Sequence, residues 1–559
     1  SLNPVLTIGK QVAEPIWLHR KKTWNEALDQ AEELIKKVSI PDARQRLDAY
    51  PHQFSGGMRQ RVMIAMALAC EPKLIIADEP TTALDVTVQA QILSLLKNLT
   101  TELNSALILI THDLGVVARY ADRVAVMYGG RIVESATAAE LYKHPKHPYT
   151  EGLMASIPTL DGEPGSRLQT IEGQPPDLLH MPAGCAFHPR CPYAAEICKH
   201  AKPSLKEVEA NHFRACVGSS IVRVSWLRVN FMTSDNHQDN IIDVKDLKVH
   251  FPVTEGLLKK TVGWNYAVDG VSFSVRRGET FSLVGESGCG KSTTALSVLR
   301  MQDVTAGNIV FNGQDITHFS ANKLRPIRRQ IQMIYQDPFG SLNPRMKVGS
   351  IIGEPLRVHG QAKDKVKYRT RVKELMRLVG LLDDMADRYP HEFSGGQRQR
   401  ICIARALALE PELIICDEPV SALDVSIQAQ VINLLMDLQE RLGLTYLFIA
   451  HDLSVVRHIS NRVAVMYLGQ IVEVADRQTL FNDPKHPYTQ ALLNAVPEPD
   501  PELESSRPER LIIGEVPSVR NPPSGCRFHP RCSKAIAQCK IDRPVLNLHN
   551  QSLIACHLY

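Results

Sequence analysis

The sequence contains no long apolar run and no strong excess of charge of either sign. No stretch approaches the roughly 18 consecutive apolar residues that a membrane-spanning helix needs, so other subunits would have to supply any spanning part. The 64 basic and 60 acidic residues leave a net charge of +4, which gives no bulk electrostatic indication of a nucleic-acid partner. No secretory signal is recognisable, which favours a reducing compartment over disulfide formation. With 559 residues, the chain is long enough for several domains.

The sequence repeats itself, and the first copy lacks a part that the second copy has. The segment 51–61, PHQFSGGMRQR, returns at 390–400 as PHEFSGGQRQR, and the offset between the copies stays at 339 to 341 residues. The residues upstream of Ser341 have no counterpart in the first copy, and they contain the only phosphate-binding loop of the sequence. The repeat therefore predicts two related domains, of which the first is incomplete.

This glycine-rich loop lies between a predicted strand and a predicted helix. Residues 280–284 form a short apolar run, residues 285–292 read GESGCGKS, and a helix-like segment follows from Thr293. Backbone N–H groups of such a loop surround phosphate oxygens, and the helix N-terminus adds partial positive charge. We expect Lys291 to reach the β- and γ-phosphates of a nucleotide and Ser292 to bind Mg²⁺.

Two acidic residues follow another apolar run in the second copy. The segment 413–418, LIICDE, predicts a buried parallel strand that ends at Asp417 and Glu418. We expect Asp417 to hold Mg²⁺ and Glu418 to polarise the attacking water. Gln336 and His451 complete the candidate catalytic set, although each is a weak signal by itself.

The order of these motifs resembles that of the ATP-binding-cassette (ABC) ATPases, and the resemblance covers nearly the whole chain. Its most specific feature is the segment 394–397, SGGQ, which resembles the signature motif of that family. A serine and two glycine amides at a helix start form a second anion site. The resemblance implies α/β P-loop NTPase cassettes, each with a mixed, mainly parallel sheet and a helical subdomain. It also implies that two cassettes close head to tail, so that the signature of one covers the ATP on the other.

Carried onto this chain, the resemblance implies one complete composite site for ATP and Mg²⁺. Gln336 would sense the γ-phosphate and Mg²⁺, His451 would contact the γ-phosphate, and residues 421–424 would be the D-loop. Tyr266 is the candidate for stacking on adenine, and an ordinary strand residue is the alternative. The signature of the first copy would cover the P-loop of the second. The candidate nucleotide-binding residues are Tyr266, Gly285, Gly288, Gly290, Lys291, Ser292, Thr293 and Asp417, with the signature residues Ser55, Gly56, Gly57, Ser394, Gly395 and Gly396.

The first copy retains part of a second site. It has Asp78, Glu79, a D-loop at 82–85 and His112, but no P-loop and no Q-loop glutamine, and Met58 replaces the usual glutamine of the signature. Because Glu79 is the acid expected of a working site, we expect the missing strand and loop to have been lost by truncation of the sequence.

Eight of the 12 cysteines form two quartets with nearly equal spacing, which indicates a metal centre. Each quartet follows a KHPYT segment, at 146–150 and at 485–489, and this tail resembles that of the di- and oligopeptide importer ATPases, with their glutathione and nickel relatives. The resemblance favours a structural [4Fe–4S] cluster, and zinc is the alternative. The candidate ligands are Cys185, Cys191, Cys198 and Cys216 in the first quartet, and Cys526, Cys532, Cys539 and Cys556 in the second.

The repeat predicts five segments. Residues 1–140 would be a truncated nucleotide-binding domain without a P-loop, 141–217 its Cys-rich extension, and 218–240 a linker. Residues 241–480 would be a complete nucleotide-binding domain and 481–559 its extension. The segment 232–236, MTSDN, resembles the start of a polypeptide, so a native linker and a joined pair of subunits both stay open.

We therefore expect an ATP-hydrolysing subunit at the cytoplasmic face of the membrane. It would energise an importer of di- or oligopeptides, or of related small solutes. The implied partners are two integral-membrane permease subunits and an external solute-binding protein, without nucleic acid, and pairing with a second ATPase chain stays open. A tandem-cassette ATPase without a transport role and an inactive fragment are the alternative functions.

Overall fold

The structure, a computed structural model, describes residues 2–81, 84–158, 165–218, 239–255, 260–421, 423–506, 512, 514 and 516–559. The chain forms two compact units. The first comprises residues 1–124, 137–142 and 495–511, and the second comprises 125–136, 143–494 and 512–559. Residues 82, 83 and 422 of the expected D-loops, and most of the expected linker, lie outside the described residues.

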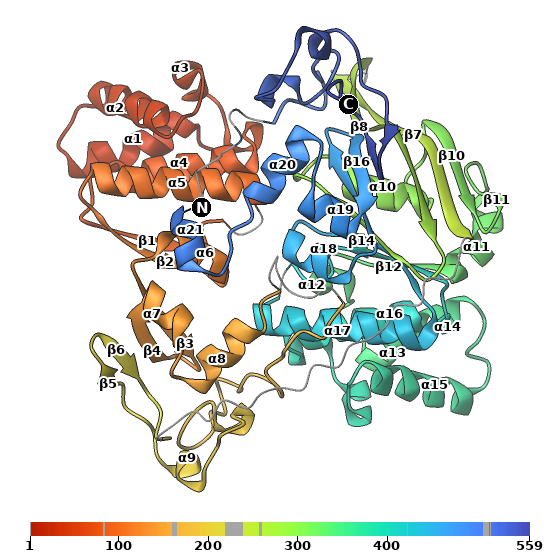
Figure 1. Cartoon of the computed structure of the whole chain (residues 1–559), viewed down its shortest axis with the longest axis horizontal. Helices are drawn as coiled ribbons and strands as arrows, with labels where there is room; N and C mark the ends of the chain where they lie inside the picture. Colours follow the sequence, from red (N-terminus) through yellow and green to blue (C-terminus); the bar gives the residue numbers. More distant parts are fainter. Residues whose placement is uncertain are drawn as a thin grey trace. The chain divides into compact units, whose positions relative to one another are not determined.

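The first unit is mainly helical (Figure 1). Its core is formed by apolar faces of the N-terminal helices, with Ile8, Ile35 and Val62 fully buried. A capping box starts its second helix, because Thr23 accepts a hydrogen bond from the Glu26 N–H and Glu26 accepts one from the Thr23 N–H. The elements are α1 (Ile8–His19), α2 (Trp24–Lys37), α3 (Ala43–Arg46), η1 (Pro51–Gln53), α4 (Gly56–Leu68), β1 (Leu74–Asp78), α5 (Val86–Glu102), β2 (Ala106–Ile110), α6 (Leu114–Tyr120), α7 (Ala138–Lys143) and α21 (Pro501–Ser506).

The second unit is organised around an eight-stranded sheet. Its order is β12-β13-β14-β9-β15-β16-β18-β17, parallel from β12 to β15 and antiparallel beyond. Every residue of β9, β13 and β14 is buried, as expected of parallel strands covered on both faces. The strands are β9 (Thr280–Val284), β12 (Ile331–Ile334), β13 (Leu413–Asp417), β14 (Thr445–Ile449), β15 (Arg462–Tyr467), β16 (Gln470–Asp476), β17 (Asn547–His549) and β18 (Ser552–Ile554).

A second sheet and a group of helices also belong to the second unit. The sheet has the order β11-β10-β7-β8, and its strands are β7 (Asn240–Glu255), β8 (Lys260–Arg276), β10 (Ala306–Phe311) and β11 (Gln314–Asp315). The helices are α10 (Lys291–Val298), α11 (Ala321–Gln330), α12 (Pro338–Ser341), α13 (Val348–Ile352), α14 (Glu354–Val358), α15 (Lys365–Leu378), η3 (Asp383–Asp387), η4 (Pro390–Glu392), α16 (Gly395–Leu407), α17 (Val425–Leu442), α18 (Leu453–Ile459), α19 (Arg477–Asn482), α20 (Pro487–Asn494), η5 (His529–Arg531) and η6 (Ala537–Lys540).

The tail of the first copy forms a separate sheet with the order β3-β4-β6-β5. The matching strands of the second copy, β15 to β18, instead continue the large sheet, because β15 pairs with β9. The elements of the first tail are β3 (Arg123–Tyr128), β4 (Arg131–Thr137), α8 (Pro148–Ala155), η2 (His188–Arg190), α9 (Glu196–His200), β5 (Lys206–Glu209) and β6 (His212–Arg214).

Each tail also packs against helices of the other copy. Within the first unit, Glu504 of α21 is buried and forms an ion pair with Arg119 of α6 at 3.3 Å. Within the second unit, the first tail lies along α17, where Asn433 exchanges two hydrogen bonds with the backbone of Leu168, at 3.0 and 2.8 Å. The two repeats are therefore interleaved in space.

No helix among the described residues is both long enough and apolar enough to cross a membrane.

The two copies of the same strand differ sharply in burial. Ile415 in β13 is fully buried, whereas Ile76, at the same position of β1, is 63% exposed. The reason is pairing: β13 lies between β12 and β14, whereas among the described residues β1 pairs with β2 alone, in a two-stranded sheet.

This difference predicts unequal effects of one substitution. Ile415→Ala should lower the free energy of unfolding by about 3 kcal/mol, since it removes buried atoms and leaves a cavity. Ile76→Ala is the matched control and should change the free energy by less than about 0.5 kcal/mol. Urea denaturation followed by circular dichroism measures both. Equal losses in the two variants would contradict the burial difference.

Candidate nucleotide site

The phosphate-binding loop connects β9 to α10, as its sequence context predicts. Gly285 and Gly290 have φ angles of +148° and +107°, in the region that favours glycine. A Cβ added at Gly285 would lie 2.2 Å from the Met466 carbonyl oxygen, and one at Gly290 would lie 2.3 Å from that of Ala267. Only glycine fits at these two positions, so the path of the loop depends on both residues.

The lysine of this loop lies buried beneath it. Lys291 Nζ donates hydrogen bonds to the carbonyl oxygens of Gly285, at 2.7 Å, and Glu286, at 3.1 Å. Lys291 thus holds the two ends of the loop together, and its positive charge lies at the N-terminus of α10, where an anion is favoured.

Ser292 and Asp417 meet beside the loop. Ser292 Oγ donates a hydrogen bond to Asp417 Oδ1 at 3.0 Å, although 125 residues separate them in sequence. Burial raises the pKa of Asp417, and the hydrogen bond from Ser292 only partly opposes this rise. A hydroxyl and a buried carboxylate are oxygen ligands that suit Mg²⁺, and a bound cation would favour the charged form of Asp417.

Glu418 lies at the centre of the candidate catalytic set. Gln336 Nε2 donates a hydrogen bond to Glu418 Oε2 at 2.7 Å, and His451 Nδ1 lies 3.2 Å from the same oxygen. Gln336 follows β12, Glu418 follows β13 and His451 follows β14. The three side chains can meet because the carboxyl ends of neighbouring parallel strands lie at one edge of a sheet. Glu418 also has a left-handed φ of +48°, a strained conformation that is typical of functional sites.

Glu418 and His451 shift each other's ionisation. Burial raises the pKa of Glu418, but the hydrogen bond and the charge of His451 outweigh it, so the pKa is lowered overall. Burial lowers the pKa of His451, but its contacts with Glu418 outweigh that effect and raise it overall. The pair therefore favours a carboxylate next to a protonated imidazole.

The first copy has a similar pair in the first unit. His112 Nδ1 lies 3.2 Å from Glu79 Oε1, and Glu79 has a φ of +44°. Both side chains are about half exposed, at 41% and 45%, and Asp78 lies at the end of β1.

Both signature motifs start a helix. Ser55 accepts a hydrogen bond from the Met58 N–H at 3.2 Å at the start of α4, and Gly56 and Gly57 form the first turn. Ser394 caps α16 in the same way, with Gly395 and Gly396 in the first turn. Each motif therefore presents backbone N–H groups at a helix N-terminus.

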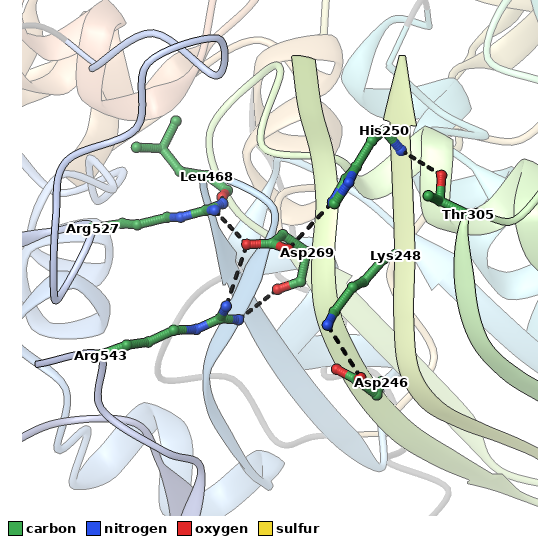
Figure 2. Close-up of polar contacts among 8 residues, drawn as sticks. All are labelled: Asp246, Lys248, His250, Asp269, Thr305, Leu468, Arg527 and Arg543. Carbon is green, nitrogen blue, oxygen red and sulfur yellow. Dashed lines mark hydrogen bonds and ion pairs between the residues drawn. The ribbon is translucent and has the colours of Figure 1, made fainter. Parts of the chain in front are cut away.

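Tyr266 lies in β8, and its ring packs against the His250 ring in a T-shaped arrangement with centroids 4.7 Å apart. Three residues later, Asp269 is bound by His250 from one side and by Arg527 and Arg543 of the C-terminal tail from the other (Figure 2). These tail contacts were not predicted from the sequence, although Arg527 beside Cys526 was a signal for one of them.

Comparison with known proteins identifies the family. Residues 1–82 and 268–421 match the family described as ABC transporter, and residues 133–198 and 472–539 match the C-terminal region of oligopeptide/dipeptide transporters. The chain is 48% identical over 519 residues to the glutathione import ATP-binding protein GsiA of Salmonella choleraesuis (strain SC-B67), covering 93% of this chain and 76% of that protein. The chain belongs to the ABC transporter ATPases.

Two further similar proteins are a second relative and a solved structure. The GsiA protein of Escherichia coli (strain K12) is 49% identical over 515 residues, which cover 92% of this chain and 75% of that protein. A solved dimer of a bacterial ABC transporter cassette is 27% identical, covers 42% of this chain and 98% of its own, and has a TM-score of 0.38. Membership of the ABC ATPases, from the family and relative matches, confirms the predicted α/β P-loop NTPase class.

The prediction of an iron–sulfur cluster in this ABC ATPase is wrong. All the cysteines are free, and no three cysteine sulfurs in the described structure lie within 4.8 Å of one another, which leaves zinc without support as well. Burial raises the pKa of the Cys191 and Cys526 thiols to about 11. Neither the matched C-terminal family nor the relatives are described as cluster proteins. The Cys526 N–H donates a hydrogen bond to the Cys539 carbonyl oxygen at 2.8 Å.

The shifted pKa values predict a pH-dependent contribution to stability. The raised pKa of His451 contributes stability that is present below its ordinary value and lost as the pH rises through the raised value. The lowered pKa of Glu418 contributes stability that is lost only as the pH falls through that lowered value. His451→Gln should therefore lower Tm more at about pH 6 than at about pH 9.

His112→Gln in the first copy is the matched control for this measurement. Its pair with Glu79 is half exposed, and solvent screens such pairs, so its effect on Tm should be small at both values of pH. A loss of Tm in His451→Gln that is the same at both values would contradict the coupling of His451 to Glu418.

Proposed function

We propose that this chain is the ATP-hydrolysing subunit of an importer of peptides or related small solutes, and that hydrolysis occurs at the P-loop of the second copy. Membership of the ABC transporter ATPases supports the reaction. The match to the oligopeptide/dipeptide transporter C-terminal region and the glutathione import relatives support the solute class. The convergence of Gln336 and His451 on Glu418 is the observation that carries the assignment of the site.

The chemistry follows from the positions of these side chains. Lys291 and the amides of the loop bind the phosphates, and Ser292 and Asp417 are the residues that would hold Mg²⁺. The ion would neutralise charge on the β- and γ-phosphate oxygens. Glu418 orients the attacking water and accepts its proton, while Gln336 and His451 hold the carboxylate in place. Catalysis of this kind depends mainly on positioning and on electrostatic stabilisation.

The composite site requires a signature motif from another cassette. We assign this role to Ser55, Gly56 and Gly57 of the first copy, whose N–H groups lie at the start of α4. The alternative is the signature at Ser394 in a second copy of this chain. In this proposal residues 241–480 are the complete nucleotide-binding domain, and residues 1–140 supply the covering signature.

The segment after Gln336 is the proposed contact with the permease subunits. Phe339 of α12 is 61% exposed and stacks on the Arg398 guanidinium, whose carbon lies 3.9 Å from the ring centre. A cavity of about 760 Å³ beside this segment is lined by Gln336, Ser341 and Arg405, among others. A coupling helix from each of two membrane subunits at the cytoplasmic face would dock here and at the matching segment of the first copy, with an external solute-binding protein delivering the solute.

ATP hydrolysis by the purified chain tests the assignment of the site. Glu418→Gln should lower kcat by at least about 100-fold, because the water loses its general base while ATP binding is retained. Glu79→Gln is the matched control in the first copy and should change kcat by less than about two-fold. A Glu418→Gln variant with wild-type kcat would remove the proposed catalytic centre.

A pair of arginine substitutions identifies the covering signature. If the signature of the first copy covers the site, Ser55→Arg should lower kcat/KM by at least about ten-fold, because the large side chain blocks the anion site. Ser394→Arg should then leave kcat/KM unchanged. The opposite result would assign the covering role to the second copy of another chain.

A further inference from the structure

The C-terminal tail reaches directly into the phosphate-binding loop. Arg531, in η5 of the tail, donates two hydrogen bonds to the carboxylate of Glu286, at 2.8 and 3.1 Å. Glu286 is the second residue of the loop GESGCGKS. The side chains are 2% and 1% exposed, so this bidentate ion pair is shielded from water and from salt.

Aromatic side chains enclose the pair. Arg531 also donates to the Tyr467 hydroxyl at 3.3 Å, and the Glu286 N–H donates to the Tyr488 hydroxyl at 3.0 Å. The rings of Tyr467 and Tyr488 are packed together with that of Phe528 from the tail. Both the side chain and the backbone N–H of Glu286 are thus held by residues outside the loop.

The tail also contacts β8, the strand that carries Tyr266, the candidate for stacking on adenine. Arg527, four residues before Arg531, forms an ion pair with Asp269 in β8 and also bonds the Leu468 carbonyl oxygen, while Arg543 contacts the same aspartate at 3.3 Å (Figure 2). In the same strand, the Tyr266 N–H donates to the Val519 carbonyl oxygen at 3.1 Å. The tail therefore contacts the strand of the adenine candidate and the phosphate loop from one short segment.

We propose that Arg531 is a positioning residue for the nucleotide, which acts by holding Glu286 and thereby fixing the path of the phosphate-binding loop. The remaining amides of the loop bind phosphate only when the loop keeps its shape, and the geometry at Gly285 and Gly290 leaves little space for adjustment. The Cys-rich tail is then part of the ATP site rather than a separate module. This inference rests on the proposed function of the loop.

The first copy offers a matched comparison for Arg531. Arg190 occupies the same place in the repeated HPRC segment and is similarly buried, and Tyr128 and Tyr149 form the same ring pair beside it. In the part of the chain that the structure describes, Arg190 binds the carbonyl oxygens of Ile171 and Glu172, at 3.1 and 3.0 Å, and not a phosphate-loop carboxylate. The two arginines thus share a structural environment and differ in contact with the nucleotide site.

Binding and hydrolysis of MgATP by the full chain test the inference. Arg531→Met should raise Kd and KM for MgATP by about ten-fold and change kcat by less than about three-fold, because the residue aligns the loop without touching the reacting atoms. Arg531→Lys should bind MgATP more tightly than Arg531→Met, since lysine keeps the charge but lacks the planar guanidinium that donates two parallel hydrogen bonds. Arg190→Met should leave Kd at its wild-type value.

A double-mutant cycle separates positioning from a general loss of structure. Glu286→Gln should also raise Kd, and the double variant Glu286→Gln/Arg531→Met should bind no more weakly than Arg531→Met alone, because both changes break one interaction. Independent, multiplying effects would overturn the inference, as would equal losses in Arg190→Met and Arg531→Met.

Lys291→Ala is the reference for the site itself. If Lys291→Ala abolishes MgATP binding while Arg531→Met keeps the wild-type Kd, the inference fails and the site stands. If Lys291→Ala leaves the Kd for MgATP unchanged, ATP binds elsewhere. That result would contradict both the proposed nucleotide site and the positioning role of Arg531.

Discussion

The pairing of β9 with β14 on one side and β15 on the other is the constraint on which the second cassette depends. Strand β9 is fully buried and carries the phosphate-binding loop at its carboxyl end. It also joins the strands that precede the candidate catalytic residues to the strands of the tail. Among the described residues, the first copy has no strand in that place. Its strands form the separate sheets β1-β2 and β3-β4-β6-β5, and Ile76 of β1 and Ile108 and Ile110 of β2 are exposed. The same strand sequence therefore has two different environments within one chain.

The tails change how the repeat should be understood. They follow the cassettes in sequence, but the structure uses them as parts of the cassettes. In the second copy the tail forms the outer strands of the large sheet, an ion pair with the phosphate loop through Arg531, and an ion pair with β8 through Arg527. Parts of each tail also pack on the other copy, as Glu504 does against Arg119. Removing a tail would expose apolar and charged groups that are now buried, in addition to removing its cysteines.

The local motifs were predictable because they depend on short segments. Each motif can be recognised from about a dozen consecutive residues, since strand, loop and helix follow one another directly. This holds for the glycines at 285, 288 and 290 with the lysine after them, and for the two acids after an apolar run. The resemblance placed Gln336 and His451 in the same site, and the structure brings both within hydrogen-bond distance of Glu418. The cysteine quartets were misread for a related reason, because spacing along the chain does not determine how closely the sulfur atoms approach.

The sequence alone determined the repeat and the α/β P-loop class, and it predicted the phosphate-binding residues, because these depend on local patterns. Only the tertiary structure decided which strand is buried in which copy, that the two repeats exchange parts of their tails, and that Arg531 meets Glu286. The last contact joins residues separated by 245 positions. No local pattern encodes such a contact, because it depends on β9, β15 and strands of the tail lying in one sheet.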